Sequence, residues 1–364
     1  MSEIRCANCK SPYPESEIPY KCLSCGGLYD FVSFPAYNPD MVDSSRVGIW
    51  RYAHALGFVS LDHEISLGEG NTPLIWDRFF NQNVAFKCEY ANPTGSFKDR
   101  GSAAIVSFLG SRNINEAVED SSGNAGASFA AYAARAGIRA RVYIPDSASG
   151  PKRSQIEAYG ADVIRIMGPR SNASEAVRVA ADKGVIYASH AYLPFNLPGY
   201  ATAAYEIYEQ LHRQSPGSVI VPLGQGGLLL GMLRGFHSLF SRGIIAKMPR
   251  FVGVQARACA PIWALHAYGR DGLRLVTEAQ TVAEGIRVRN PLRGDAILHW
   301  VEAHNGLFLA VDEEDILPAR DLLARRGFYV EATSAVVLKA LEQVADQLPG
   351  PIIMMLTGSG LKSP

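Results

Sequence analysis

The sequence predicts an α/β fold in which parallel sheets are covered by helices. Short apolar segments typical of strands alternate with longer segments of helical pattern along most of the 364 residues. Glycine-rich turns connect several of these strands to the helices that follow. The length leaves room for two sizeable domains and one small additional element. The expected strands are 84–88, 118–120, 141–144, 163–166, 186–188, 219–223, 251–255 and 352–356.

The N-terminal segment, residues 1–34, predicts a small zinc-ribbon-like element. It holds two Cys-x-x-Cys pairs separated by twelve residues, namely Cys6 with Cys9 and Cys22 with Cys25. Four thiolates at this spacing can surround one zinc ion tetrahedrally and close every coordination position, which is typical of a structural site. A module of this size has too little core to fold alone, so the metal would supply folding free energy. Two disulfides, or a degenerate element without metal, are the alternatives.

A lysine stands at the start of the first expected helix of the α/β region. Lys98 follows the Asn-Pro-Thr-Gly turn at 92–95 and precedes the small-residue segment 102–109. The positive end of a helix dipole disfavours a charged ammonium, so an amine placed there is suited to attack a carbonyl. The alternative is a surface lysine that pairs with Asp99 or Glu89.

Two glycine-rich turns between a strand and a helix predict anion-binding sites, because backbone N–H groups at the start of a helix bind carboxylates and phosphates. Glycine also closes such turns for geometry alone, so each turn taken singly is a weak signal. The first turn contains Ser121, Ser122, Gly123, Asn124 and Ala125. The second contains Gly224, Gln225, Gly226, Gly227 and Leu228.

A hydroxyl also follows the last expected strand, since Thr357 comes directly after 352–356. Ligands of open α/β sheets gather at the carboxyl ends of the strands, so Lys98, the two turns and Thr357 predict one shared crevice. Pyridoxal 5'-phosphate (PLP) together with an amino acid fits this set of groups. The amine serves the cofactor aldehyde, one turn serves its phosphate, and the other turn serves the substrate α-carboxylate.

From about residue 67 to its end the sequence resembles the fold-type-II PLP enzymes, and most closely the threonine synthases. The motifs that carry the resemblance occur in family order at 68–74, 92–101, 121–126, 199–207, 224–227, 283–286, 331–335 and 357–362. The resemblance implies a PLP-dependent lyase of threonine biosynthesis, which converts O-phosphohomoserine and water to threonine and phosphate by γ-elimination and β-addition. The alternative is a related β-replacement or elimination enzyme of the cysteate synthase or threonine/serine dehydratase type.

The resemblance also implies residue roles. Lys98 would bind the cofactor aldehyde covalently and later move protons at the substrate carbons. Asn124 would donate a hydrogen bond to the cofactor's phenolic oxygen, and Thr357 would face its pyridine nitrogen as a neutral hydroxyl, which favours elimination over transamination. The N–H groups of 224–228 would hold the cofactor phosphate, and the turn 121–125 would hold the substrate carboxylate. A noncatalytic regulator on the same scaffold is disfavoured because these side chains are intact.

The resemblance further implies a large PLP-binding domain, formed by 35–99 and 191–364, and a smaller mobile domain, 100–190, with the cofactor in the cleft between them. One departure concerns the substrate. Many threonine synthases carry an arginine for the substrate phosphate shortly before the motif at 199–207, whereas residues 190–198 contain none. The side chains that we consider as replacements are His190, Asn196, Lys152 and Arg153.

Composition is that of a cytoplasmic enzyme. The 35 basic and 35 acidic side chains cancel, so we expect no nucleic-acid partner and no membrane partner. No signal peptide is recognisable and no apolar run is long enough to span a membrane. The two cysteines outside the N-terminal pairs, Cys88 and Cys259, are expected to be core thiols in a reducing compartment. We expect a small-molecule amino-acid substrate and a homodimer.

Overall fold

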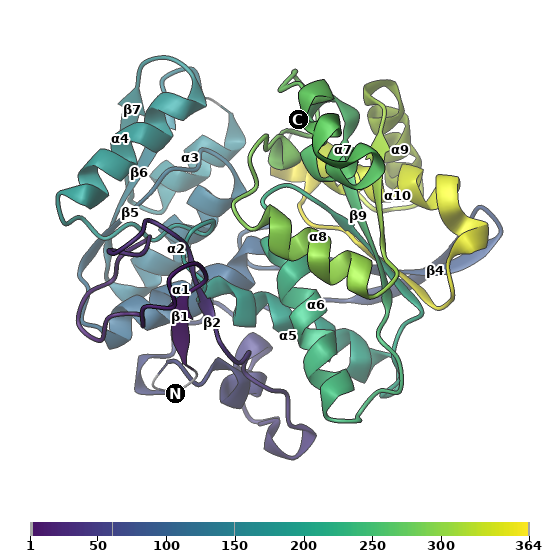
Figure 1. The fold of residues 1–364 in the computed structure, drawn as a ribbon, viewed down its shortest axis with the longest axis horizontal. Helices are drawn as coiled ribbons and strands as arrows, with labels where there is room; N and C mark the ends of the chain where they lie inside the picture. The colour runs from purple at the N-terminus through teal and green to yellow at the C-terminus, as the bar shows by residue number, and fades with distance from the viewer. Residues whose placement is uncertain (1–2, 60, 149, 363–364) are drawn as a thin grey trace. The chain divides into compact units, whose positions relative to one another are not determined.

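A computed structural model describes residues 3–59, 61–148 and 150–362 of the chain. Backbone contacts divide it into two compact units (Figure 1). Unit 1 comprises Met1–Gly70, Asn92–Thr94 and Lys98–Tyr200, and unit 2 comprises Asn71–Ala91, Gly95–Phe97 and Ala201–Pro364. The predicted domains 1–34, 35–99 with 191–364, and 100–190 remain a proposal. Their outermost residues, Met1, Ser2, Ser363 and Pro364, lie outside the described residues.

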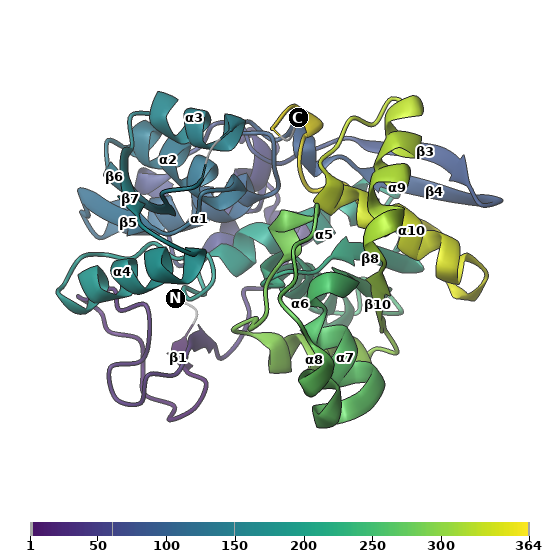
Figure 2. The same cartoon turned by 90° about the horizontal axis from the view of Figure 1, so that it is seen from above.

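Unit 1 is built on a three-stranded parallel sheet with the order β5-β6-β7. Residues 186–188 run along the free edge of β5 through a parallel bridge between Tyr187 and Val118. In Figure 2, α2 and α4 cover opposite faces of this sheet, and both contact β6. The elements are β5 Glu116–Glu119, β6 Arg139–Pro145, β7 Asp162–Ile166, α1 Lys98–Ser111, α2 Asn124–Ala136, α3 Pro151–Ala158 and α4 Arg170–Asp182.

Small side chains explain the close packing of α1 against α2. Helix α2 is rich in alanine, and most of it is fully buried. Alanine has the highest helix propensity and allows two helix backbones to approach closely. The helix ends at Gly137, which adopts the left-handed conformation (φ 70°) and donates its N–H to the carbonyls of Ala133 and Ala134.

The N-terminal element packs on the core of unit 1. Its two short strands, β1 Ile4–Cys6 and β2 Tyr29–Phe31, pair antiparallel. Tyr13 lies edge-on to Phe195, with 5.3 Å between ring centroids, and Phe195 stacks on Phe108 of α1 at 3.7 Å. The element therefore shares an aromatic core with the rest of unit 1, in keeping with its being too small to have a core of its own.

Unit 2 contains a six-stranded sheet with the order β10-β9-β8-β11-β4-β3. All pairings are parallel except that of the edge strand β3 with β4. The strands are β3 Leu74–Phe79, β4 Gln82–Lys87, β8 Ser218–Pro222, β9 Arg250–Ala256, β10 Leu307–Val311 and β11 Ile352–Met355. Every residue of β8 and β11 is buried, as expected for strands covered on both faces.

Helices cover both faces of this sheet. Helix α10 packs on β8, β9 and β10, and Figure 2 shows α6, α7 and α8 on the other side of these strands. The helices are α5 Asn196–Gln210, which begins in unit 1, α6 Gly227–Ser241, α7 Pro261–Tyr268, α8 Gly294–Ala303, α9 Glu313–Arg325 and α10 Ala332–Val344. Short 3-10 helices occupy Pro39–Met41, Gly48–Leu56, Leu61–His63, Glu89–Ala91, Arg257–Cys259, Gly269–Leu275, Glu284–Ile286, Ala345–Gln347 and Gly360–Lys362.

The predicted fold class, parallel sheets covered by helices, is confirmed. Seven of the eight expected strands are present within one or two residues, and 186–188 is present only as a single bridge. The prediction missed β1, β2, β3 and β10. Strand β3 has an exposed edge and mixed polarity, so it lacks the continuous apolar run that marks the buried parallel strands.

A buried ion pair anchors the chain entry into unit 2. Lys87, at the end of β4, donates to Glu206 (2.7 Å), to the carbonyl oxygen of Thr72 (2.8 Å) and to Gln210 (3.0 Å). The side chains of Lys87 and Glu206 are 0% and 2% exposed. Glu206 also accepts the N–H of Asn71 at 2.7 Å. These bonds together fix the segment that leads into β3. Among the described residues no helix is both long and apolar enough to cross a membrane.

Candidate active site

Lys98 is the first residue of α1, as the sequence predicted. The next residue, Asp99, is fully buried and accepts the N–H of Thr94 (2.7 Å), the hydroxyl of Thr94 (2.5 Å) and the hydroxyl of Ser128 (2.6 Å). These bonds fix the turn 92–94 against the first turn of α1 and against α2. They therefore hold the backbone that carries the lysine in one orientation.

The turn between β5 and α2 presents a helix N-terminus that no side chain caps. Gly123 is the N-cap residue, and its N–H donates to Ser121 Oγ at 3.2 Å. A Cβ at Gly126 would lie 1.8 Å from the carbonyl oxygen of Ser121, so only glycine allows the turn to fold this tightly over the helix start. The N–H groups at this point suit a carboxylate. The predicted residues Ser121 to Ala125 thus form a turn with the required chemistry.

Sequence reasoning missed a buried pair beside this turn. Glu119, the last residue of β5, lies 2.6 Å from His190 Nδ1, and the two side chains are 1% and 16% exposed. Burial raises the pKa of Glu119 well above its ordinary value, and the charge of Asp120 adds to this shift. Burial also lowers the pKa of His190 well below its ordinary value, and the positive charge of Lys98 adds to that shift. Both groups therefore favour their neutral forms, and both lie within reach of the lysine's field.

The side chains considered as phosphate ligands differ in what they already bind. Arg153 makes two hydrogen bonds of 2.9 Å to Glu157 one turn later in its own helix. Asn196 donates to the carbonyl oxygen of His190 at 2.5 Å, so it supports the backbone of that residue. The side chain of His190 contacts Glu119, which lies two residues before the turn 121–125.

In unit 2, the second glycine-rich turn leads from β8 into α6. Gly226, the N-cap residue, has a φ of 77°, and no side chain caps this helix start. A Cβ at Gly224 would lie 3.0 Å from the carbonyl oxygen of Gly285, because the segment 283–286 passes close to the turn. Gln225 accepts the N–H of Leu292 at 3.2 Å, so its amide supports a neighbouring loop. The N–H groups of 226–228 are thus arranged for a phosphate.

The hydroxyl of Thr357 lies 3.0 Å from that of Ser334, a residue that sequence reasoning did not single out. Ser334 Oγ accepts the N–H groups of Thr357 and Gly358, each at 3.0 Å. With both acceptor positions filled, its own hydrogen is left to donate, either to Thr357 Oγ1 at 3.0 Å or to the carbonyl oxygen of Gly358 at 3.4 Å. When Ser334 donates to Thr357, the hydroxyl hydrogen of Thr357 is left for a ring nitrogen. The motif at 331–335 contained this serine, but the sequence did not indicate which hydroxyl it orients.

One buried hydroxyl of unit 2, that of Ser96, is unsatisfied within the described part of the chain. Ser96 is fully buried, and its Oγ has no hydrogen-bond partner among the described residues. Its backbone is bridged to Gly358, and Phe97 donates its N–H to the carbonyl oxygen of Thr357 at 3.0 Å. Lys98 is the next residue along the chain. Unsatisfied buried hydroxyls are rare, so this atom, the uncapped start of α6 and the Thr357 hydroxyl, all in unit 2, fit part of a polar cofactor such as PLP.

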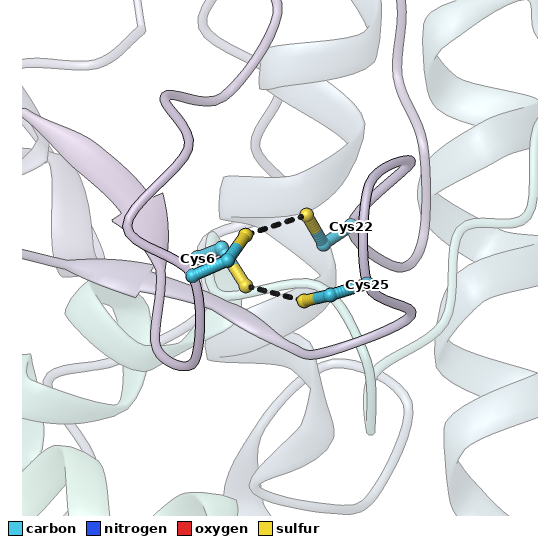
Figure 3. Close-up of side chains that lie close together, drawn as sticks. Cys6, Cys22 and Cys25 are labelled. Atoms are coloured by element: carbon cyan, nitrogen blue, oxygen red, sulfur yellow. Dashed lines mark hydrogen bonds between the residues drawn. The ribbon is translucent and has the colours of Figure 1, made fainter.

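The four N-terminal cysteines form one cluster. Their sulfur atoms all lie within 4.8 Å of one another, with 3.5 Å between Cys6 and Cys25 and 3.5 Å between Cys9 and Cys22. Figure 3 shows Cys22 and Cys25 pointing from one loop toward the segment that carries Cys6. A disulfide requires about 2.05 Å, whereas four thiolates around a zinc at about 2.3 Å are roughly 3.8 Å apart. All four thiols are free. The geometry fits a metal site and excludes the two disulfides in this structure.

Residues 65–358 match the model of the family described as pyridoxal-phosphate dependent enzyme. The chain belongs to this family. It is 34% identical to the threonine synthase of Methanocaldococcus jannaschii, with 99% of this chain and 93% of the relative covered. It is 30% identical to the threonine synthase of Methanosarcina acetivorans, with 100% and 93% covered. The predicted resemblance to PLP-dependent threonine synthases is confirmed.

Solved structures show the same fold. A threonine deaminase from T.th. matches with a TM-score of 0.65 and 28% identity, covering 79% of this chain and 92% of that one. Maize serine racemase matches with a TM-score of 0.68 and 22% identity, covering 79% and 88%. The structure thus places the predicted cofactor and substrate groups in two sets. Unit 1 holds Lys98 and the turn 121–125, and unit 2 holds the turn 224–228 and Thr357.

Proposed function

We propose that this PLP-family chain is a threonine synthase, which converts O-phosphohomoserine and water to threonine and inorganic phosphate. The observation that carries the proposal is the similarity to two archaeal threonine synthases over essentially the whole chain. In the net reaction the phosphate leaves the γ-carbon and a water hydroxyl is added at the β-carbon. When bound, PLP stabilises the negative charge that develops at the substrate carbons.

The residues around the proposed site have distinct tasks. The N–H groups at the start of α6 bind the cofactor phosphate, and Thr357 donates its hydroxyl hydrogen to the pyridine nitrogen. Because this partner is a neutral hydroxyl held by Ser334, it does not keep the nitrogen charged. Asn124 donates to the phenolic oxygen of the cofactor. The N–H groups of the turn 121–125 receive the substrate carboxylate and fix its orientation.

Lys98 has two tasks in this proposal. Its amine holds the cofactor through a covalent bond in the resting enzyme. With substrate bound, the amine of Lys98 would take a proton from one substrate carbon and return it at another. The neighbouring pair of Glu119 and His190, both favouring the neutral form, adds no buried ionic charge next to the amine.

The deciding experiment is the release of phosphate from O-phosphohomoserine with threonine measured in parallel. We expect equal amounts of both products from the wild type, and none from Lys98→Ala. Lys183→Ala, at the exposed end of α4, is the matched control and is expected to behave as the wild type. The visible absorbance of the lysine-bound cofactor gives a second readout, which Lys98→Ala abolishes. Bound cofactor without either product would refute the proposal.

A threonine or serine dehydratase is the second candidate. The 28% identity to the T.th. threonine deaminase and the lack of an arginine in 190–198 both favour it. The two activities separate in one assay, because a dehydratase releases ammonia and a 2-oxo acid from threonine or serine. We expect that release to be slow compared with turnover of O-phosphohomoserine. The opposite ratio would establish the dehydratase.

We infer that the cysteine cluster holds a structural zinc ion. Four thiolates close the coordination shell, so the metal stabilises the N-terminal element and takes no part in the reaction. We expect one zinc per chain by mass spectrometry, lost in Cys22→Ser and retained in the control Cys259→Ala. Purified protein that contains PLP but no zinc, and takes up none, would contradict this. A cytoplasmic homodimer stays a prediction, for which light scattering of the purified protein gives the subunit number.

A further inference from the structure

A set of polar side chains in unit 1 has no role in the account of the cofactor. Glu119 and His190 form a buried pair at the carboxyl end of β5, next to the turn 121–125. The second carboxylate oxygen of Glu119, Oε2, is buried and has no hydrogen-bond partner among the described residues. A side chain that is 1% exposed and only half satisfied at a strand end indicates a site built for a further group.

Helix α4 brings an arginine to the same place. Ser174 of this helix donates its hydroxyl to Asp120 Oδ2 at 2.5 Å, and Asp120 comes directly after Glu119. This bond fixes one face of α4 over the turn that follows β5. Arg170, the first residue of α4, lies four residues before Ser174 and therefore on the same face, one turn closer to the helix start. Arg170 makes no ion pair with any residue that the structure describes.

The charges in this set favour an anion. Arg170 lies on the face of α4 that Ser174 fixes against Asp120, and its positive charge acts on both Glu119 and His190. Burial raises the pKa of Glu119, which disfavours the charged form of this carboxyl group. The nearby carboxylate, Asp120, is engaged by the hydroxyls of Ser174 and Tyr187 at 2.5 and 2.7 Å.

The pair also fixes how His190 presents its ring. Oε1 of Glu119 lies 2.6 Å from Nδ1, and we assign Glu119 as the donor of this bond, in keeping with its raised pKa, which puts the hydrogen of the neutral imidazole on Nε2. The ring nitrogen on the far side from Glu119 is then a hydrogen-bond donor. A guanidinium together with a neutral N–H donor suits the oxygens of a phosphate monoester.

We propose that Arg170 and the Glu119–His190 pair bind the side-chain phosphate of the substrate. This assignment rests on the proposed function and names the residues that select a phosphorylated amino acid. Arg170 supplies the guanidinium that the segment 190–198 lacks, from a different element of the same unit. Arg170 and His190 contact the phosphate oxygens, whereas Glu119 is a positioning residue that acts through His190.

Binding of a stable substrate analogue tests this directly. The probe is 2-amino-5-phosphonopentanoate, in which a methylene group replaces the bridging oxygen, and norvaline is the same amino acid without the phosphonate. Both are titrated into the PLP-loaded enzyme by calorimetry. We expect Arg170→Ala to weaken the phosphonate roughly 10- to 100-fold, as for loss of a charge-assisted hydrogen-bonded pair, and norvaline less than about twofold.

Matched variants distinguish recognition from loss of folding. Arg178→Ala removes another arginine of α4, two turns along, and should leave both affinities unchanged. Arg170→Lys keeps the charge but not the planar fork, so we expect an intermediate affinity for the phosphonate. His190→Gln, which keeps an N–H donor, should lose less phosphonate affinity than His190→Ala.

The outcomes separate this inference from the proposed function. If the wild type makes threonine and Arg170→Ala binds the phosphonate as tightly as the wild type does, the assignment of Arg170 is wrong and the function stands. If Arg170→Ala loses the phosphonate selectively but the wild type makes no threonine, the phosphate site stands and the function is wrong. A wild type that binds norvaline but not the phosphonate overturns the assignment of the site.

Discussion

Replacing Gly126 by alanine tests whether the turn 121–125 is part of the active site. The added Cβ would lie 1.8 Å from the carbonyl oxygen of Ser121, whereas real Cβ atoms essentially never come closer than 3.0 Å. The turn must move to make up the difference between these two distances, because the added Cβ is attached to the backbone of helix α2, which is packed in place. A displacement of about 1 Å in a group that positions substrate costs roughly 100-fold in rate. We therefore expect kcat/KM for O-phosphohomoserine to fall about 100-fold.

The assay is threonine formation at a series of substrate concentrations, with cofactor content measured for each preparation. Gly110→Ala is the matched control, since this glycine lies in α1 and a Cβ there meets nothing within 4 Å. We expect the control to keep its activity and to gain up to about 1 kcal/mol of stability, because alanine is the better helix former. A Gly126→Ala enzyme with full cofactor content and kcat/KM within threefold of the wild type would refute the assigned role of the turn.

Three further predictions follow from buried groups. Glu119→Ala should lower kcat/KM roughly tenfold more than Glu119→Gln, since a glutamine amide still donates to His190 Nδ1; an equal loss in both variants contradicts a protonated Glu119. Lys87→Met should reduce the free energy of unfolding by about 3–5 kcal/mol in urea titrations, because Glu206 loses the buried ammonium that faces its carboxylate, and the double variant with Glu206→Gln should recover part of it; a loss below 1 kcal/mol would show the pair to be dispensable. Burial raises the pKa of Glu69 to about 7, so the stability contributed by its protonated form is full below about pH 4.5 and is lost as the pH rises to about 7. Relative to Glu69→Gln, the wild type should therefore lose up to about 3 kcal/mol of unfolding free energy between pH 5 and pH 8. Parallel pH profiles of the two proteins would contradict this.

Local sequence determines most of the fold and the backbone parts of the proposed site. The buried parallel strands appear as continuous apolar runs, and the glycine turns after β5 and β8 appear as short motifs between a strand and a helix. Lys98 at the first position of α1 was predictable for the same reason, because the turn and the helix around it are adjacent in sequence. Each of these features depends on residues within about ten positions of one another.

Side-chain partnerships between distant segments were not predictable. Glu119 and His190 are 71 residues apart, and Asp120 and Ser174 are 54 residues apart. Their contacts exist because 186–188 lies beside β5 and because α4 packs across β6 and β7. Arg170 stands in an exposed, polar helix start, where an arginine has no distinctive pattern. Only the register of α4 against the turn after β5 reveals what this arginine faces.

Asp120 links the two kinds of anion recognition that the proposals assign to unit 1. It directly precedes Ser121, the first residue of the carboxylate turn, and it accepts hydroxyls from Ser174 of α4 and from Tyr187. Ser174 carries the face of α4 that includes Arg170, and Tyr187 lies three residues before His190. One buried carboxylate thus ties together the turn for the α-carboxylate and both groups proposed for the side-chain phosphate. A change in the position of either anion site must be transmitted to the other, so the distance between the two negative ends of the substrate is itself a property that unit 1 selects.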